Sequence, residues 1–183
     1  MNLFIDTHLN DVVIILTDDN NVIIKQKKIE GEKQNSKIIM PTIKKLLNKN
    51  VPNSIIVVNG PGSFTGVRLG VTIAKTMAFT MKKPIRTITS LECMAVCSSE
   101  DEKIMAFSDN NGYYVGIFDE ENKLVGNYEY LNNSQFTKYS EMHKVIQDVH
   151  IDYQKIIAYA LTKDPINAHE VNPIYVKKID VEK

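Results

Sequence analysis

Residues 59–70 read Asn-Gly-Pro-Gly-Ser-Phe-Thr-Gly-Val-Arg-Leu-Gly, and they are the most informative segment of the chain. The apolar run 55–58 before it is typical of a buried strand, and the long apolar stretch after it is typical of a helix. Gly60 and Gly62 permit backbone angles that other residues avoid, and Pro61 between them fixes its own φ. The stretch therefore predicts an elbow that joins a strand to a helix.

The elbow also carries the residues of a candidate anion site. Ser63 or Thr65 can cap the first N–H groups of the helix, and glycine-bearing loops at helix N-termini bind phosphate through such groups. The known phosphate fingerprints are not matched, because no Gly-Lys-Ser/Thr closes the loop and the third glycine of a dinucleotide-binding loop would fall on Thr65. Two interpretations stay open: a rigid corner, or a phosphate or nucleotide contact made by Gly60, Gly62, Ser63 and Thr65.

The sequence of this elbow resembles the bacterial TsaB (YeaZ) family, whose members are subunits of the machinery that makes N6-threonylcarbamoyladenosine in tRNA. Further matches follow in the same order along the chain, at 4–7, 36–41, 74–75, 78–79, 89–92 and 172–176. The resemblance is close over the first half of the chain and thin over the remainder. The Ile-Asp-Thr start is shared with the wider actin-like superfamily.

The composition is that of an ordinary globular protein, with 43% hydrophobic and 24% charged residues. The net charge is zero, so no global field attracts nucleic acid or an anionic membrane, and tRNA is expected to be contacted only indirectly. No apolar run approaches the roughly 20 residues of a membrane helix. The start of the chain does not resemble a signal peptide, and we expect a cytoplasmic location with Cys93 and Cys97 as reduced core thiols.

The order of the predicted elements indicates an α/β fold. Strands are expected at 2–6, 11–17, 21–28, 54–58 and 85–88, and helices at 36–49, 64–82 and 90–98. Strand signals recur at 103–108, 112–118, 123–130 and 155–160, with a helix over 134–147. Two strand meanders suggest duplicated mixed-sheet units of the actin-like, ribonuclease H-like type. We expect residues 1–100 to form the N-terminal unit with the elbow, and 101–183 a smaller, truncated C-terminal unit.

Helix 64–82 has more apolar surface than one sheet can cover. Its two apolar stripes together span roughly 200° of the helix surface, whereas a helix on a sheet usually shows an arc of about 100° or somewhat more. The second stripe meets either helix 36–49 of the same chain or a partner subunit, and the resemblance favours the partner. The predicted interface residues are Ile39, Ile43, Leu47, Leu69, Ile73 and Met77. Glutamate at Ile73 or Met77 is then expected to abolish pairing and leave the monomer folded.

The chain is poor in catalytic constellations. Its histidines are scattered, and the helix that carries two of them in the catalytic paralogue of the resembled family has none here, so we expect no metal and no catalytic residue. Ser63 has no evident histidine partner to activate it. Asp6 and Asp109, each at the end of a predicted strand, are interpreted as structural. The tyrosines of the second meander are interpreted as cross-strand packing.

The resemblance implies a non-catalytic scaffold or activator subunit of the threonylcarbamoyladenosine machinery. It implies pairing with the catalytic threonylcarbamoyltransferase (TsaD-like) subunit, recruitment of an ATPase (TsaE-like) subunit, and a homodimer in their absence. No cofactor is expected to bind strongly, although ATP or ADP at the subunit interface stays open. The alternative is an actin-like phosphotransferase that binds nucleotide with Asp6 and the Gly60–Gly66 loop.

Overall fold

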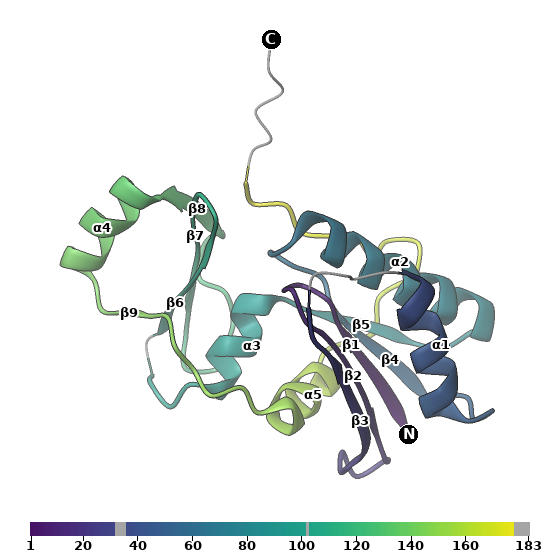
Figure 1. The fold of residues 1–183 in the computed structure, drawn as a ribbon. Helices are drawn as coiled ribbons and strands as arrows, with labels where there is room; N and C mark the ends of the chain where they lie inside the picture. The colour runs from purple at the N-terminus through teal and green to yellow at the C-terminus, as the bar shows by residue number, and fades with distance from the viewer. Residues whose placement is uncertain (32–35, 102, 178–183) are drawn as a thin grey trace. The chain divides into compact units, whose positions relative to one another are not determined.

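The computed structural model describes residues 1–31, 36–101 and 103–177, which form two compact units (Figure 1). Unit 1 comprises Met1–Ser90 and Tyr153–Pro173, and unit 2 comprises Leu91–Asp152 with the segment that begins at Ile174. Both units are discontinuous, because the chain returns to unit 1 before it ends in unit 2. Whether 1–100 and 101–183 are separate domains stays a prediction.

Unit 1 is built on a five-stranded mixed sheet with the order β3-β2-β1-β4-β5. Its strands are β1 (Asn2–Asp6), β2 (Val12–Thr17), β3 (Ile23–Ile29), β4 (Ser54–Val58) and β5 (Ile85–Ile88), and its helices are α1 (Ser36–Leu47), α2 (Phe64–Met81) and α5 (Tyr153–Thr162). Strands β1, β2 and β3 pair antiparallel, whereas β1, β4 and β5 pair parallel through helical crossovers. The predicted mixed sheet is therefore confirmed.

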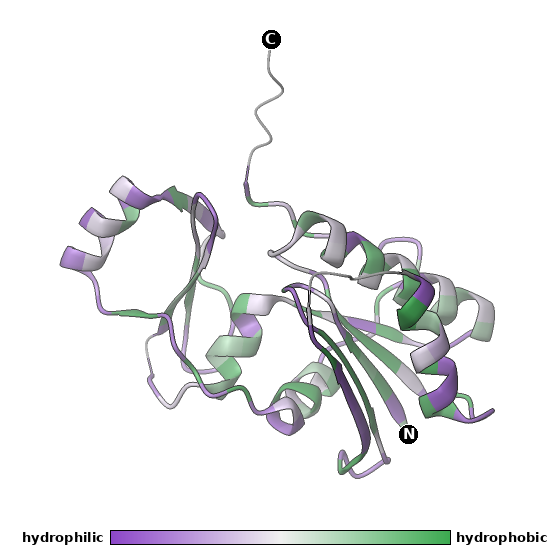
Figure 2. Cartoon of the chain, viewed as in Figure 1, coloured by the Kyte–Doolittle hydropathy of each residue, from purple (hydrophilic) through white to green (hydrophobic). Residues whose placement is uncertain are grey.

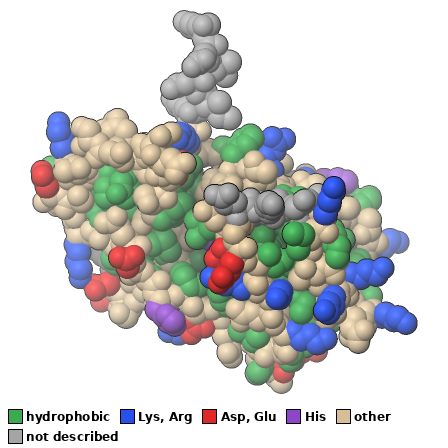
Figure 3. All heavy atoms as spheres, in the orientation of Figure 1, with side chains coloured by type: hydrophobic (Ala, Val, Ile, Leu, Met, Phe, Trp, Pro, Cys, Tyr) green, Lys and Arg blue, Asp and Glu red, His purple; other side chains and the backbone are tan. Residues whose placement is uncertain are grey.

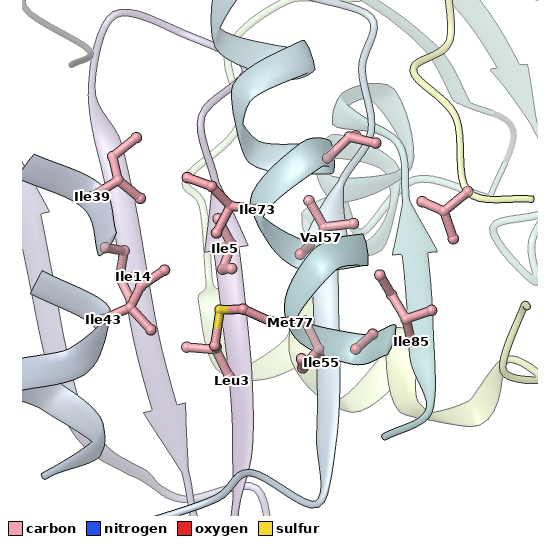
Figure 4. Packing of buried hydrophobic residues seen from close by; sticks show 14 of the residues in the cluster. Leu3, Ile5, Ile14, Ile39, Ile43, Ile55, Val57, Ile73, Met77 and Ile85 are labelled. Atoms are coloured by element: carbon pink, nitrogen blue, oxygen red, sulfur yellow. The ribbon is translucent and has the colours of Figure 1, made fainter. Parts of the chain in front are cut away.

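The two faces of this sheet are covered by different helices. Leu3 and Ile5 of β1 belong to a buried cluster with residues of α1 and α2, and Figure 4 shows side chains of both helices over the strands. Phe4, between them in sequence, points to the opposite face, where its ring centroid lies 5.8 Å from that of Tyr153 in α5. Helix α1 contacts β2 and β3, whereas α2 contacts β1, β4 and β5. Hydrophobic residues fill the central strands, and hydrophilic ones dominate the edge strand β3 (Figure 2).

Unit 2 contains a four-stranded mixed sheet with the order β8-β7-β6-β9. Its strands are β6 (Lys103–Asp109), β7 (Gly112–Phe118), β8 (Glu129–Asn132) and β9 (Val145–Ile146); α4 (Asn133–Met142) follows β8, and α3 (Ser90–Cys97) begins at the last residue of the first segment of unit 1. Among its described residues, one buried cluster lies around Met105 and Phe118 and another around Phe136.

Three predictions for the second half of the chain were wrong in type or extent. The strand predicted at 155–160 is helix α5, because Ile156, Ile157 and Ala160 are spaced to share one buried helix face. The helix predicted over 134–147 ends at Met142, where the next residue is extended, and a short strand follows it. The strand predicted at 123–130 is reduced to an isolated bridge at Leu124 and to β8.

A close contact between β1 and α2 fixes their separation. Thr7 follows β1 and is fully buried, and its hydroxyl donates a 2.7 Å hydrogen bond to the carbonyl of Gly66 in the first turn of α2. One turn further along α2, a Cβ added at Gly70 would lie 2.2 Å from Thr7 Oγ1. Only glycine at position 70 therefore lets the helix lie at this distance from the strand.

We predict that Gly70→Ala lowers the free energy of unfolding by about 1–3 kcal/mol, because the added methyl group forces apart two packed elements. Urea unfolding followed by circular dichroism measures this. In the Thr7→Ala background the same substitution should cost clearly less, since the colliding hydroxyl is gone. Thr72→Ala, at an exposed position of α2, is the control and should change stability by less than about 0.5 kcal/mol. Equal costs of Gly70→Ala in both backgrounds would contradict the packing explanation.

Candidate functional site

The elbow between β4 and α2 is packed against the residue that follows Thr7. Gly60 has φ +101°, and the peptide bond between it and Pro61 is cis. A Cβ at Gly62 would lie 2.3 Å from the carbonyl oxygen of His8, and the amide of Ser63 donates a 2.7 Å hydrogen bond to that same oxygen. Gly62 therefore serves the close approach of the loop to the end of β1, and Gly60 supplies the left-handed backbone angle before it.

The elbow is closed by hydrogen bonds within the chain. Ser63 is the N-cap of α2, and its Oγ accepts a 3.3 Å bond from the amide of Gly66. Ser90 donates from its amide to the carbonyl of Gly60 at 3.0 Å and from its hydroxyl to that of Pro61 at 2.7 Å. Thr65 is exposed in the first helical turn. This geometry accounts for the elbow as a rigid corner, and a phosphate or nucleotide contact there stays a prediction.

The buried carboxylate of Asp6 lies beside this loop. Its Oδ1 accepts a 3.1 Å hydrogen bond from the amide of His8 and a 2.6 Å bond from His8 Nδ1, which must be the donor because an ionised carboxylate only accepts. The carboxylate thus terminates β1 and holds the imidazole. This is the structural role expected of an acid at the strand end.

Five of the six predicted interface residues lie in the core of unit 1. Between 1% and 8% of their surface is exposed; they are Ile39, Ile43, Leu47, Ile73 and Met77. Leu69, the sixth, is partly buried against the same cluster. The second apolar stripe of α2 therefore packs with α1 inside the same chain (Figure 4), as one of the two alternatives had it. The expectation that these side chains are available to a partner is corrected.

The opposite side of α2 is exposed and carries two large aromatic side chains. We call this surface the outer face of α2 and define it by Phe64, Arg68, Thr72, Thr76 and Phe79, which fall within an arc of roughly 120°. Phe79 is 59% and Phe64 47% exposed. The Arg68 guanidinium lies 5.0 Å from the centroid of the Phe64 ring. On the adjoining helix α1, Ile38 and Met40 are also exposed.

Sequence reasoning missed this surface, although a signal for it was present. On the helical wheel the small residues Gly66 and Gly70 lie between the two apolar stripes, which indicates that both stripes and the glycines face into the protein. The threonines and Phe79 are then left on the outside. The outer face is found by asking how much of the helix circumference is buried, and the number of apolar residues alone does not show it.

In unit 2, Asp109 is the centre of a hydrogen-bonded cluster. Its Oδ1 accepts a 2.6 Å bond from the hydroxyl of Tyr130 and a 2.8 Å bond from the amide of Asn111, and Lys177 Nζ lies 3.2 Å from Oδ2. Burial by itself would raise the pKa of this carboxyl group, but these hydrogen bonds and the lysine charge outweigh it and lower the pKa below its ordinary value of 3.8. The pKa of the Tyr130 hydroxyl is raised, by burial and by its bond to Asp109.

The tyrosines of unit 2 pack against neighbouring elements. The rings of Tyr114 in β7 and Tyr130 in β8 meet edge to face at 5.0 Å, which confirms the predicted cross-strand packing for this pair. Tyr113 instead stacks on Phe136 of helix α4 at 3.6 Å. Within residues 1–31, 36–101 and 103–177 no group of three or more His, Cys, Asp or Glu side chains is placed to hold a metal ion. No helix in these ranges is long and apolar enough to cross a membrane.

Comparison with known proteins identifies relatives over much of the chain. A family model described as "TsaD: tRNA N6-adenosine threonylcarbamoyltransferase" matches residues 21–117. The tRNA threonylcarbamoyladenosine biosynthesis protein TsaB of Bacillus subtilis is 35% identical over 132 residues, which are 67% of this chain and 57% of that protein. The uncharacterised MG208 homolog of Mycoplasma pneumoniae is 32% identical over 127 residues, 64% of this chain and 63% of that protein. The matches thus span less than two thirds of these relatives.

The fold also has a solved counterpart. The structure of YeaZ from Pseudomonas aeruginosa superimposes with a TM-score of 0.76 and 16% identity, covering 95% of this chain and 98% of that one. This likeness shows that the chain shares the fold of that protein, and the two mixed sheets confirm the predicted α/β class.

We predict that Asp109→Asn lowers the free energy of unfolding by about 1–2 kcal/mol at pH 7, because the charged acceptor of the bonds from Tyr130, Asn111 and Lys177 is lost. The folded-state pKa lies below the unfolded one, so the contribution is present above pH 3.8 and is lost as pH falls through the folded-state pKa. The difference between variant and wild type, measured by urea unfolding, should therefore shrink in acid. A difference that keeps its size through acid titration of the carboxylate would contradict this account. Tyr130→Phe, which removes one donor, should reproduce part of the effect.

Proposed function

We propose a function for this chain from the premise that it belongs to the TsaB (YeaZ) group of the tRNA N6-adenosine threonylcarbamoyltransferase family, whose model matches more than half of its residues. The proposed function is that of a non-catalytic scaffold or activator subunit in the synthesis of N6-threonylcarbamoyladenosine in tRNA. The chain pairs with the catalytic, TsaD-like subunit and orders its active conformation.

The outer face of α2 is the observation that carries this proposal. Two aromatic side chains and a row of threonines lie exposed on a helix whose other side is fully committed to the core. Threonine side chains are short and uncharged. A partner helix can therefore approach α2 closely, and ordering the threonines on binding costs little side-chain entropy. Phe64 and Phe79 supply the larger apolar contacts that anchor interfaces. Ile38 and Met40 of α1 extend the apolar area at its edge.

The chemistry of the elbow supports a non-catalytic role. Oδ1 of Asp6 accepts hydrogen bonds from the amide and from the ring of His8, and the Ser63 hydroxyl caps the N-terminus of α2. A phosphotransferase would need the acid at this position to organise a metal and nucleotide. No specific contact favours that alternative over the scaffold role.

The other proposed partners also rest on membership of this family. We propose that the paired subunits recruit an ATPase (TsaE-like) subunit, that the chain pairs with itself when the catalytic subunit is absent, and that ATP or ADP binds at the subunit interface if it binds at all. One surface then serves both kinds of pairing, so homodimer and heterodimer compete for the outer face of α2.

We predict that the double variant Thr72→Glu/Thr76→Glu loses pairing with the catalytic subunit. Both side chains are exposed in the monomer, so its stability should change by less than about 0.5 kcal/mol per site, whereas two carboxylates buried unpaired in an interface cost several kcal/mol. Co-expression with the catalytic subunit of the same organism, followed by size-exclusion chromatography with light scattering, tests this. A 1:1 complex for the wild type and separate elution of the variant are expected.

Two comparisons make this test specific. Thr137→Glu, at an exposed position of α4, is the matched control and should pair like the wild type. Ile73→Glu and Met77→Glu should instead unfold or strongly destabilise the monomer, because both side chains are buried. Pairing of the double threonine variant at wild-type yield would remove the outer face of α2 from the interface. Absence of any complex with the wild type would contradict the proposed function itself.

A further inference from the structure

Positive charge is concentrated in one part of this electrically neutral chain. Residues 23–49, which include β3 and α1, contain eight lysines and two glutamates, whereas the whole chain has a net charge of zero. Helix α1 contains no acidic residue. The absence of a global field, which the sequence indicates, therefore conceals a strongly basic region.

The fold brings six of these lysines to one surface. We call it the β3–α1 lysine face and define it by six exposed residues: Lys25, Lys27, Lys37, Lys44, Lys45 and Lys49. Figure 3 shows basic side chains gathered over this part of unit 1. Helix α1 contacts both β2 and β3, so its outward lysines continue the row that begins on the edge strand.

The register of the sheet shows which strand lysines belong with the helix. Lys25 pairs with Leu16 and Lys27 with Ile14, and both partners have side chains in the core cluster beneath α1. Lys25 and Lys27 therefore point to the same side of the sheet as α1. Lys25 Nζ donates a 3.0 Å hydrogen bond to the carbonyl of Leu46 in the last turn of α1, which sets the start of β3 beside the end of the helix.

Some of these lysines have structural partners and others do not. Lys25 binds the end of α1. Lys28 points to the other side of the sheet and does not belong to the face; it pairs with Asp11 at 2.8 Å and with Glu30 at 3.5 Å. Among the described residues no ion pair or hydrogen bond involves the ammonium groups of four members of the face. They are Lys27, Lys44, Lys45 and Lys49. These four charges are available to an external anion.

We propose that the β3–α1 lysine face binds the phosphate backbone of RNA. The inference deepens the proposed function, because it assigns part of the contact with the tRNA substrate to this chain. Ammonium groups on flexible stems neutralise phosphates as point charges, and the face has neither the arginine forks nor the aromatic rings that read bases. Binding is therefore independent of base sequence and sensitive to salt.

The structure favours RNA over a membrane as the polyanion. An interfacial membrane helix buries an apolar face in the lipid. The apolar stripe of α1, formed by Ile39, Ile43 and Leu47, is occupied by the core of unit 1. Ile38 and Met40 are the exposed large apolar side chains of α1, and the other outward positions are mostly lysines. Two separate apolar side chains do not form the continuous apolar face that lipid requires, whereas the lysines suit a hydrated phosphate chain.

The position of the face is compatible with subunit pairing. Helix α1 lies over β2 and β3, whereas α2 lies over β1, β4 and β5. The β3–α1 lysine face and the outer face of α2 are therefore neighbouring but separate parts of one helical layer. A partner on α2 leaves the lysines at the β3 edge open, and an RNA bound by both subunits would cross from one to the other.

The test is binding of an unmodified tRNA transcript to the full chain in complex with its catalytic subunit, measured by fluorescence anisotropy over a range of salt concentrations. The variant Lys27→Gln/Lys44→Gln/Lys45→Gln/Lys49→Gln should weaken binding about tenfold or more at low salt. The slope of log Kd against log salt should fall by about 3, since each lysine–phosphate contact contributes about 0.7–0.9. The substituted side chains are exposed, so an unchanged thermal unfolding midpoint is expected.

A charge-matched control separates this surface from overall charge. Lys123→Gln/Lys138→Gln/Lys144→Gln/Lys155→Gln removes four exposed lysines that lie outside β3 and α1, and should leave the slope and the affinity unchanged. Equal loss in both variants, or no loss in the first, would overturn the proposal. Stronger lysine-dependent binding of polyglutamate or of phosphatidylserine-containing vesicles than of tRNA would also overturn it, in favour of an acidic protein or a membrane.

Pairing is measured on the same samples by size-exclusion chromatography. A quadruple lysine variant that pairs normally and binds tRNA like the wild type contradicts only the proposed role of the lysine face. Failure of the wild-type chain to pair at all defeats the proposed function instead, and tRNA binding by the isolated chain then decides whether the lysine face stands without it.

Discussion

The fold of unit 1 depends on how closely α2 can approach the end of β1. Thr7 is buried against the backbone of α2 at the level of Gly66 and Gly70, and the elbow before the helix packs Gly62 against His8. A side chain at Gly62 or Gly70 would collide with His8 or Thr7 and hold the helix away from the sheet. Because α2 lies this deep, Ile73 and Met77 reach the cluster that α1 also fills, and one continuous core forms under both helices. The depth at which α2 packs also determines which residues of α1 and α2 stay exposed.

Much of this architecture was predictable from the sequence, because periodicity and turn chemistry act locally. The elbow, strands β4 and β5 and helix α2 were placed within a residue of their observed bounds, since glycine and proline limit the alternatives there. Helix α5 was mistaken for a strand because a short apolar run fits either period, and its helical character depends on tertiary contacts with β4 and β5.

The interface residues were less predictable, for a different reason. A helical wheel shows that Ile73 and Met77 need an apolar neighbour but cannot say whether that neighbour belongs to the same chain. The answer depends on the position of α1, which is fixed by the sheet order and by burial of Ile39 and Ile43, not by any local signal in α2. The exposed threonines on the opposite side carry no apolar signature, so a count of hydrophobic residues passes over them.

Charge obeys the same logic at a larger scale. A net charge of zero describes the far field, but a bound macromolecule lies within about 10 Å of the surface, where screening leaves only nearby charges effective. The lysines of β3 and α1 form one surface only because the fold places Lys25 of β3 beside Leu46 at the end of α1. The same helical layer thus presents a face of low charge on α2 and a basic face on α1 and β3. Two faces of such different chemistry suit different partners, which under the two proposals are a protein on α2 and an RNA on the lysines of α1 and β3.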